Sequence, residues 1–173
     1  QMADEFGVEH DDFKLIGQDN IRRYLPVHDL RIRVCAGDSL FDILARVCAA
    51  RAAGCRITVS LVEDLDSPVL AFLERATESW GAAIEFVEEG DAALVDVIRT
   101  GHTGRLRYTR PENIPTAIWE TVADTGIFLA HAPVLMEGRI ELLWYLREQS
   151  LSIDYHRYGN LGARASETRA EPM

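Results

Sequence analysis

Short stretches with the two-residue apolar period of a β-strand alternate along this chain with stretches that have the longer period of an α-helix. A strand that is followed by a helix and then by another strand crosses over its sheet and pairs in parallel. The sequence therefore predicts an α/β fold with a Rossmann-like, mostly parallel sheet and helices on both faces. The expected strands are residues 30–34, 57–61, 84–87, 106–108 and 127–130.

The helices between these strands carry start and stop signals. Ser39 and Asp42 have the spacing of a capping box, in which each residue accepts a backbone N–H of the other. The apolar positions that follow have helical spacing as far as Gly54, and a glycine readily adopts the left-handed conformation that ends a helix. Gly101 and Gly126 stand at the ends of two later helical stretches in the same way.

Several of the expected strands alternate between apolar and polar residues. Arg31, Arg33, Arg56 and Thr58 occupy the polar positions of the first two strands. A parallel sheet that is covered on both faces has strands that are apolar on both sides. We therefore expect a sheet that is incompletely covered, or that has one edge in solvent.

The composition and charge of the chain argue against nucleic acids and membranes as binding partners. The 173 residues are 47% hydrophobic, which suits one domain with a core and an extra segment. The formal charge is −10 and no basic cluster is longer than Arg22-Arg23, so we expect no nucleic-acid binding. No apolar stretch approaches the roughly 20 residues of a membrane span, and no signal peptide is recognisable. We expect a cytoplasmic protein without a membrane span.

The cysteines agree with that location. Cys35, Cys48 and Cys55 are odd in number and lack the spacing of metal ligands. Free thiols are the normal state of cysteine in a reducing compartment.

The C-terminal part of the chain contains an apolar helix and a strand that both require a packing partner. Residues 138–149 read as an apolar helix, which has to be covered on more than one face. It leads directly into an alternating strand in which Leu151, Ile153 and Tyr155 share one side. A strand at a chain end is free to add to a sheet edge, its own or a neighbour's.

A nucleotide-binding sheet of this kind usually has a glycine-rich turn after its first strand, where backbone N–H groups approach phosphate. Here that turn is Cys35-Ala36-Gly37-Asp38-Ser39, with one glycine and an acidic residue where an anion would lie. Asp38 is better explained as a favourable helix cap than as part of a phosphate site.

Other candidate groups carry little chemistry. His10-Asp11-Asp12 has the residue types of a metal site, but nothing nearby completes one. Gly101-His102-Thr103-Gly104 is better read as a turn than as a ligand loop. His28, His131 and His156 have no recognisable Ser or Cys partner. His131 follows a strand end, where active-site residues of such sheets gather, so an independent small enzyme or nucleotide-binding domain that uses His131 is the alternative function.

Residues 40–60, with an alanine-rich helix end before Gly54 and a strand, resemble the first helix and second strand of an aldehyde dehydrogenase nucleotide-binding domain. The two ends of the chain are similar to the C-terminal domain of the longer members of the proline utilization A family, and the similarity spans residues 13–162. The residues that carry it are Gly17-Gln18-Asp19-Asn20 with Tyr24-Leu25-Pro26, and Glu137-Gly138-Arg139 with Leu142-Leu143, Tyr145, Glu148, Ser150-Leu151-Ser152 and Gly159-Asn160.

The chain departs from the active members of the superfamily at each functional position. No cysteine has the Gly-Gln-x-Cys context of the nucleophile, and Ser60 replaces the cofactor-binding lysine. Thr109-Arg110-Pro111 replaces the Gly-Ser turn, and residues 129–133 replace the acidic residue and glycines before the nucleophile. Residue by residue, no catalytic, cofactor or metal site carries over. In the tail, His156-Arg157-Tyr158 replaces small residues of the family pattern.

The resemblance implies a parent enzyme that oxidises proline to glutamate, with FAD in its proline dehydrogenase site and NAD in its semialdehyde dehydrogenase site. This segment would have no cofactor of its own. It would cover the aldehyde dehydrogenase module of the same polypeptide and help to enclose the path of the intermediate; assembly into a homo-oligomer is left open. The expected interface residues are Trp144, Tyr145, Leu151, Ile153, Tyr155 and Tyr158.

The same resemblance divides the chain into segments. We expect a linker and lead-in over residues 1–27 and a Rossmann-like domain of the aldehyde dehydrogenase superfamily over residues 28–149. A docking strand over 150–162 and a disordered polar tail over 163–173 would follow.

Overall fold

The computed structural model describes residues 2–65, 67–155 and 162–169. The chain divides into two compact units. Unit 1 comprises residues 1–25 and 146–173, and unit 2 comprises residues 26–145. Among the described residues, no helix has both the length and the apolar character needed to cross a lipid bilayer.

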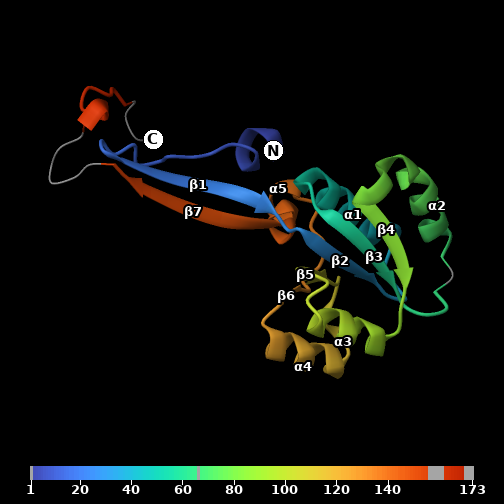
Figure 1. Ribbon diagram of the computed structural model, residues 1–173. Helices are drawn as coiled ribbons and strands as arrows, with labels where there is room; N and C mark the ends of the chain where they lie inside the picture. The colour runs from blue at the N-terminus through green and yellow to red at the C-terminus, as the bar shows by residue number, and fades with distance from the viewer. Residues whose placement is uncertain (1, 66, 156–161, 170–173) are drawn as a thin grey trace. The chain divides into compact units, whose positions relative to one another are not determined.

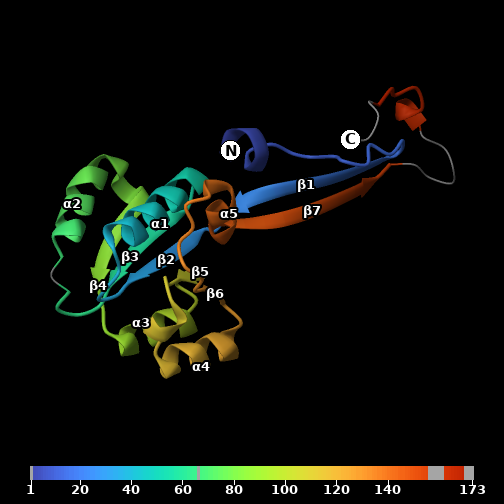
Figure 2. The same cartoon turned by 180° about the vertical axis from the view of Figure 1, so that it is seen from behind.

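Unit 2 is the α/β fold that the strand and helix periods predict. Its five strands form one parallel sheet in the order β4-β3-β2-β5-β6. Figures 1 and 2 show α1 and α2 on one side of this sheet and α3 and α4 on the other. The strands are β2 (Asp29–Val34), β3 (Arg56–Leu61), β4 (Ile84–Glu88), β5 (Arg105–Arg107) and β6 (Phe128–Ala130); the helices are α1 (Leu40–Ala53), α2 (Pro68–Thr77), α3 (Asp91–Arg99), α4 (Thr116–Thr125) and α5 (Gly138–Leu142).

Short 3₁₀ segments join some of these elements, namely η2 (Glu78–Ala83), η3 (Pro111–Asn113) and η4 (Leu143–Tyr145). The expected helix ends are confirmed for α1 and α4. Gly54 and Gly126 follow these helices with φ of 86° and 71°, a left-handed conformation that costs a residue with a Cβ atom free energy.

One face of the sheet is apolar across its centre. Alternate residues of β2 and β3 point toward α1, where they meet a row of buried helix residues. The buried residues of this layer are Leu30, Ile32, Val34, Ile57 and Val59 from the strands and Ile43, Val47 and Ala50 from α1.

The other face is divided. Leu106 and Tyr108, on β5 and just beyond it, form a buried cluster with residues of α3 and α4. Beside them, β2, β3 and β4 present Arg31, Thr58 and Glu85 in one register row. Thr58 is half-buried and Glu85 is exposed. The polar strand positions thus correspond to the part of the sheet that α3 and α4 do not cover.

The predicted C-terminal helix is wrong in length. We expected residues 138–149 to be helical, but α5 ends at Leu142, η4 ends at Tyr145, and β7 (Leu146–Asp154) begins at once. Residues 142–146 form an uninterrupted run of large apolar side chains. The only polar side-chain atoms in this run are the indole nitrogen of Trp144 and the hydroxyl of Tyr145. A short apolar run has the same pattern in a helix and in a strand. The sequence therefore does not show where the helix ends and the strand begins.

Unit 1 contains a two-stranded sheet of β1 (Gln18–Pro26) and β7, whose arrows run in opposite directions in Figure 1. The N–H of Tyr155 donates to the Gly17 carbonyl (3.1 Å), and Arg23 donates to Gln149 (2.7 Å). The sequence predicts only a lead-in segment over these residues, so β1 was not predicted. The reason is that β1 has no apolar alternation: all nine of its residues are half-buried.

Both ends of the described chain contact β1. A π-helical turn, η1 (Met2–Phe6), places the buried Phe6 edge-on against Tyr24, at 4.9 Å between ring centroids. At the other end, η5 (Gly162–Arg164) precedes residues in which Arg164 and Arg169 pair with Asp19. These contacts fall in a range expected to be a disordered tail; the rest of that tail, from residue 170, lies outside the described residues.

Candidate functional site

The carboxyl ends of β2 and β5 meet where the strand order reverses. From β2 the chain builds β3 and β4 on one side, then returns to build β5 and β6 on the other. Ligands of doubly wound sheets bind in the crevice at this switch point. The candidate site therefore comprises the two loops that leave β2 and β5.

The turn after β2 is held by its own chain. The N–H of Asp38 donates to the Cys35 carbonyl (3.1 Å), and Gly37 has a φ of 88°, which favours glycine. Ser39 caps α1: its hydroxyl accepts the N–H of Asp42 (3.1 Å), and Asp42 accepts the N–H of Ser39 (2.9 Å). This confirms the predicted capping box. Burial raises the pKa of Asp42, but the Ser39 hydrogen bonds outweigh it and hold that pKa below its usual range.

The Asp38 carboxylate points into the switch point instead of capping the helix. Its Oδ2 accepts the N–H of Cys35 (3.2 Å) and lies 2.7 Å from Nη2 of Arg46. Its Oδ1 accepts the hydroxyl of Thr109 (2.6 Å), which belongs to the loop after β5. The prediction that Asp38 serves as a helix cap is therefore wrong, because Ser39 and Asp42 already satisfy the helix start.

Arg46 is the cation that this carboxylate neutralises. It lies on α1 and is fully buried, and the Asp38 side chain is only 1% exposed. Its Nη1 donates to the Arg33 carbonyl (2.7 Å) and its Nε to the Asp42 carbonyl (2.8 Å). Burial lowers the pKa of Arg46, and the charge of Asp38 opposes that shift. We call Asp38, Arg46, Thr109 and the Cys35 N–H the Asp38 cluster.

A second buried network lies beside it at the carboxyl ends of β2 and β3. Nη1 of Arg33 donates to the Ser60 hydroxyl (2.9 Å) and to the Glu89 carbonyl (2.8 Å), and Nη2 reaches Asp91 (3.0 Å). Ser60 in turn donates to the Glu89 carboxylate (2.5 Å). Ser60, which the resemblance matches to the cofactor-binding lysine, thus uses its hydroxyl within the chain.

A third buried ion pair lies on the side of β5 that faces α1. Nη2 of Arg107 donates to Oε1 of Glu141 (3.0 Å), and the Tyr145 hydroxyl donates to the same oxygen (2.7 Å). The other oxygen of Glu141 accepts the N–H of Leu135 (3.0 Å). Burial raises the pKa of Tyr145, so its phenol remains a neutral donor.

The thiols near these networks are not activated. Burial, with the nearby Asp38 charge, raises the pKa of Cys35 to about 11, and burial raises that of Cys55 to about 11. Among the described residues, no group of His, Cys, Asp and Glu side chains has the geometry of a metal site.

His131, the residue of the alternative function, lies after β6. Its ring packs edge-on against Trp119, at 5.2 Å between centroids, and it makes no hydrogen bond within the described part of the chain. No nucleophile is brought to it there. His10 bonds to the Glu5 carbonyl (2.8 Å) and pairs with Arg22 of β1.

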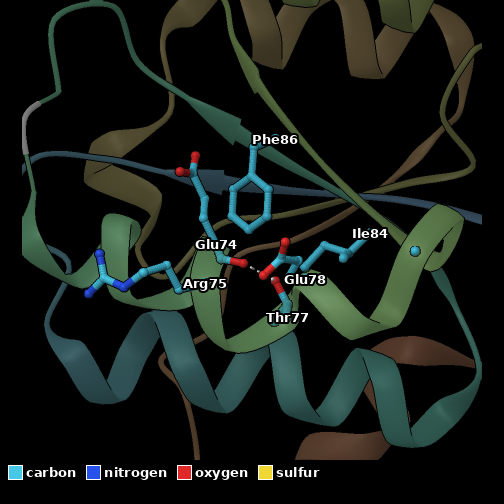
Figure 3. Close-up of a pocket in the computed structure, with 7 residues that line it drawn as sticks. Glu74, Arg75, Thr77, Glu78, Ile84 and Phe86 are labelled. Carbon is cyan, nitrogen blue, oxygen red and sulfur yellow. Dashed lines mark hydrogen bonds between the residues drawn. The ribbon is translucent and has the colours of Figure 1, made fainter.

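A separate pocket of about 450 Å³ lies between α2, η2 and β4, far along the sheet from the switch point. Figure 3 shows Phe86 and Ile84 of β4 facing the end of α2. Its charged groups are the exposed Glu74, Arg75 and Glu78, which remain in solvent. The Thr77 hydroxyl bonds to carbonyls of its own helix, so the pocket offers no buried polar group to a ligand.

The structure distributes the expected interface residues over both units. Tyr145 is fully buried in unit 2, and Trp144 is half-buried there, stacked on Phe128 at 6.4 Å. On β7, Ile153 is 43% exposed and Leu151 is half-buried. Tyr155 donates its hydroxyl to Asp19 (3.0 Å) and stacks under Arg164. Tyr158 lies outside the described residues.

The burial of three arginines was not predicted from the sequence. Arg33, Arg46 and Arg107 are all at most 2% exposed, and each neutralises a carboxylate or binds strand-end carbonyls. One signal was present: Arg46 lies next to Val47 and three residues after Ile43, on the face of α1 that packs on the sheet. An arginine on such a face requires a buried partner.

Comparisons with known proteins agree with this fold. No family model matches the chain, and no curated protein matches it in sequence. Among solved structures, it is similar over 91% of its length to proline utilization A from Corynebacterium freiburgense, with 28% identity and a TM-score of 0.53. It is also similar over 70% of its length to an aldehyde dehydrogenase from Bacillus cereus, with 15% identity and a TM-score of 0.59. A dehydrogenase structure from Sinorhizobium meliloti 1021 that holds NAD matches 65% of the chain at 20% identity, with a TM-score of 0.51.

The sheet, its helices and these neighbours show an aldehyde dehydrogenase-like α/β fold. Within that class of fold the chain is similar to proline utilization A. The chain covers 13% of the Corynebacterium freiburgense protein and 26% of the Bacillus cereus enzyme, so it corresponds to a small part of each.

Proposed function

We propose that this chain is the covering C-terminal domain of a cytoplasmic proline utilization A-type enzyme. The parent oxidises proline to glutamate, using FAD in one active site and NAD in another. This domain has no active site of its own. It packs against the aldehyde dehydrogenase module of the same polypeptide, supports it, and helps to enclose the path of the semialdehyde intermediate. The Asp38 cluster is the observation that carries the proposal.

The Asp38 cluster supports a role without a nucleotide because the chain's own carboxylate takes the place of a phosphate. The Cys35 N–H, the Thr109 hydroxyl and Arg46 are the kinds of donor that bind phosphate oxygens in a nucleotide site. All three donate to Asp38. An incoming phosphate would also meet the Asp42 carboxylate at the start of α1. The negative charges of a phosphate and of these carboxylates repel each other, so a dinucleotide phosphate would not bind favourably at this turn.

Unit 1 supports a role in packing. A two-stranded sheet is marginally stable alone in water, and unit 1 contains no third strand among its described residues. It also exposes large apolar side chains, namely Val8, Phe13, Leu15, Ile16 and Ile153. Exposed apolar groups beside an unpaired strand edge are typical of a surface that another chain segment covers.

The alternation of β7 defines the face that would dock. Leu151, Ile153 and Tyr155 project to one side, and Ser152 and Asp154 to the other. Of the expected interface residues, Ile153 is the best probe because its side chain is exposed. Substitution of Trp144 or Tyr145 would disturb the packing of unit 2 itself.

The proposal is tested in the full-length polypeptide by Ile153→Asp, with Ser150→Asp as the matched control. Both variants add one carboxylate to an exposed position of β7, but only the first places it on the apolar side. We expect Ile153→Asp to lower semialdehyde dehydrogenase activity about tenfold or more, or to dissociate the assembly, whereas Ser150→Asp leaves both unchanged. Wild-type activity and mass for Ile153→Asp would count against the proposal.

Ligand binding separates this proposal from a nucleotide-binding enzyme. A ligand at a hundredfold excess over its dissociation constant stabilises a protein by about 2.7 kcal/mol. We expect no such thermal shift of the chain with NAD, NADP, ATP or FAD. A saturable shift with any of them, lost in His131→Ala, would favour the alternative function.

A further inference from the structure

A polar pocket of about 380 Å³ opens at the other end of the sheet, among the first residues of the strands. It lies on the face that α3 and α4 leave uncovered beside β5. The turn after α3, for which the sequence predicts no function, forms one wall. The pocket is lined by Asp29, Arg31, Arg56, Thr58, Glu85 and Gly101–Thr103.

The strand register makes the floor of this pocket polar. Arg31, Thr58 and Glu85 are direct neighbours on β2, β3 and β4. The next residue in the row is Leu106 of β5, which is buried under α3 and α4. The helices α3 and α4 therefore cover the Leu106 end of this row. The polar end, on β2, β3 and β4, is left uncovered and forms the pocket.

Arg31 is the group in this pocket that lacks a full set of partners. Its side chain is only 9% exposed, and its one ionic contact among the described residues is from Nε to Oε1 of Glu89, at 3.2 Å. That contact lacks hydrogen-bond geometry, and no described residue accepts from Nη1 or Nη2. A guanidinium that has lost most of its water and has unfilled donors is costly unless an acceptor binds to it.

Arg56 and His102 line the same pocket. Arg56 is exposed, and its guanidinium makes no hydrogen bond within the described chain. The Thr100 hydroxyl donates to a carbonyl of its own helix (2.7 Å), so it accepts the hydrogen of His102 Nδ1 (2.8 Å), and Nε2 of that tautomer is an acceptor. The carboxylates of the lining are exposed: Glu85 accepts the Thr58 hydroxyl (2.7 Å), and Asp29 lies at the start of β2. They remain acceptors for a hydroxyl or ammonium group of the same ligand.

We propose that this pocket binds a small molecule that carries an oxyanion, a carboxylate or a phosphate. Arg31 and Arg56 bind its oxygens, and Nε2 of His102 accepts from a hydroxyl or ammonium group of the same ligand. The attraction is local, because the chain as a whole has a formal charge of −10 and repels anions elsewhere. The site is distinct from the switch point, where the donors are already bound to Asp38.

Isothermal titration of the chain with inorganic phosphate and with succinate, at constant ionic strength, tests the proposal. We expect one of them to bind at one site with a dissociation constant of about 1 mM or tighter. Arg56→Gln should weaken that binding about tenfold without loss of the fold, because the side chain is exposed. Arg31→Gln should abolish it.

The matched control is Arg147→Gln, which removes the same charge from an exposed position of β7. It should leave binding unchanged. Binding of phosphate but not succinate would identify a phosphorylated ligand, and the reverse a carboxylic acid; both support the site. Absence of saturable binding by either probe, or equal binding by Arg56→Gln and wild type, would overturn it.

Discussion

The substitution Asp38→Asn tests the Asp38 cluster quantitatively. It removes one charge from a buried pair and leaves Arg46 fully buried without its counter-ion. Two unit charges about 4 Å apart attract by about 4 kcal/mol at the effective dielectric constant of a protein. Removal of one partner of a buried pair costs about 3–5 kcal/mol in measured cases. We expect unit 2 to lose about 3–5 kcal/mol of unfolding free energy.

Urea unfolding followed by tryptophan fluorescence measures this loss. Trp80, Trp119 and Trp144 all belong to unit 2, so the signal reports on the unit that contains the cluster. With a denaturant slope of about 2 kcal/mol per molar, the midpoint should fall by roughly 2 M. Asp96→Asn is the matched control, since it makes the same change at an exposed position of α3. It should change stability by less than about 0.5 kcal/mol.

The double variant separates loss of the ion pair from general disruption. Replacement of both members of a buried pair by uncharged residues is often nearly neutral, because no uncompensated charge remains. Asp38→Asn combined with Arg46→Met should therefore cost less than the sum of the single changes. A loss below about 1 kcal/mol for Asp38→Asn, or strictly additive effects, would refute this explanation of the cluster.

Three other predictions concern single groups. At pH 8, Ellman's reagent should label the exposed Cys48 rapidly, and should label Cys35 and Cys55 slowly, because both thiols have pKa values near 11. Hydrogen bonds from Arg169 and Arg164 lower the pKa of Asp19 to about 2, so an NMR titration should find its carboxylate ionised at pH 3. The contribution of this carboxylate to the unfolding free energy is complete above pH 3.8 and is lost as the pH falls through about 2. Tyr145→Phe removes a buried hydrogen bond to a carboxylate and should cost unit 2 about 1–3 kcal/mol in urea unfolding.

Much of the fold was predictable because local patterns and tertiary packing agree in unit 2. The strands and helices have clear periods, and Ser39 and Gly54 mark the ends of α1 as expected. The polar residues of β2 and β3 indicated that one face is partly uncovered. The unpredicted strand β1 has no apolar period, since its residues are half-buried on both sides of a two-stranded sheet.

The candidate site was predictable only in part. The sequence identified the turn at residues 35–39 and the acidic residue in it, but it assigned Asp38 to the wrong partner. A capping role depends on neighbours within a few residues, whereas the actual partners are Arg46, eight positions along, and Thr109, which the fold brings from β5. Pairing over such a separation depends on the parallel register of β2 and β5 and is not encoded in local spacing.

The claim that β7 adds to another module is tested most directly by hydrogen exchange of its amides in the full-length polypeptide. The N–H of Tyr155 donates toward β1, so the amides of Ser150, Ser152 and Asp154 point to the free edge. We predict that these three amides exchange as slowly as those of a central strand, because the aldehyde dehydrogenase module covers them. Exchange within seconds, at the rate of an open strand edge, would contradict the proposed docking.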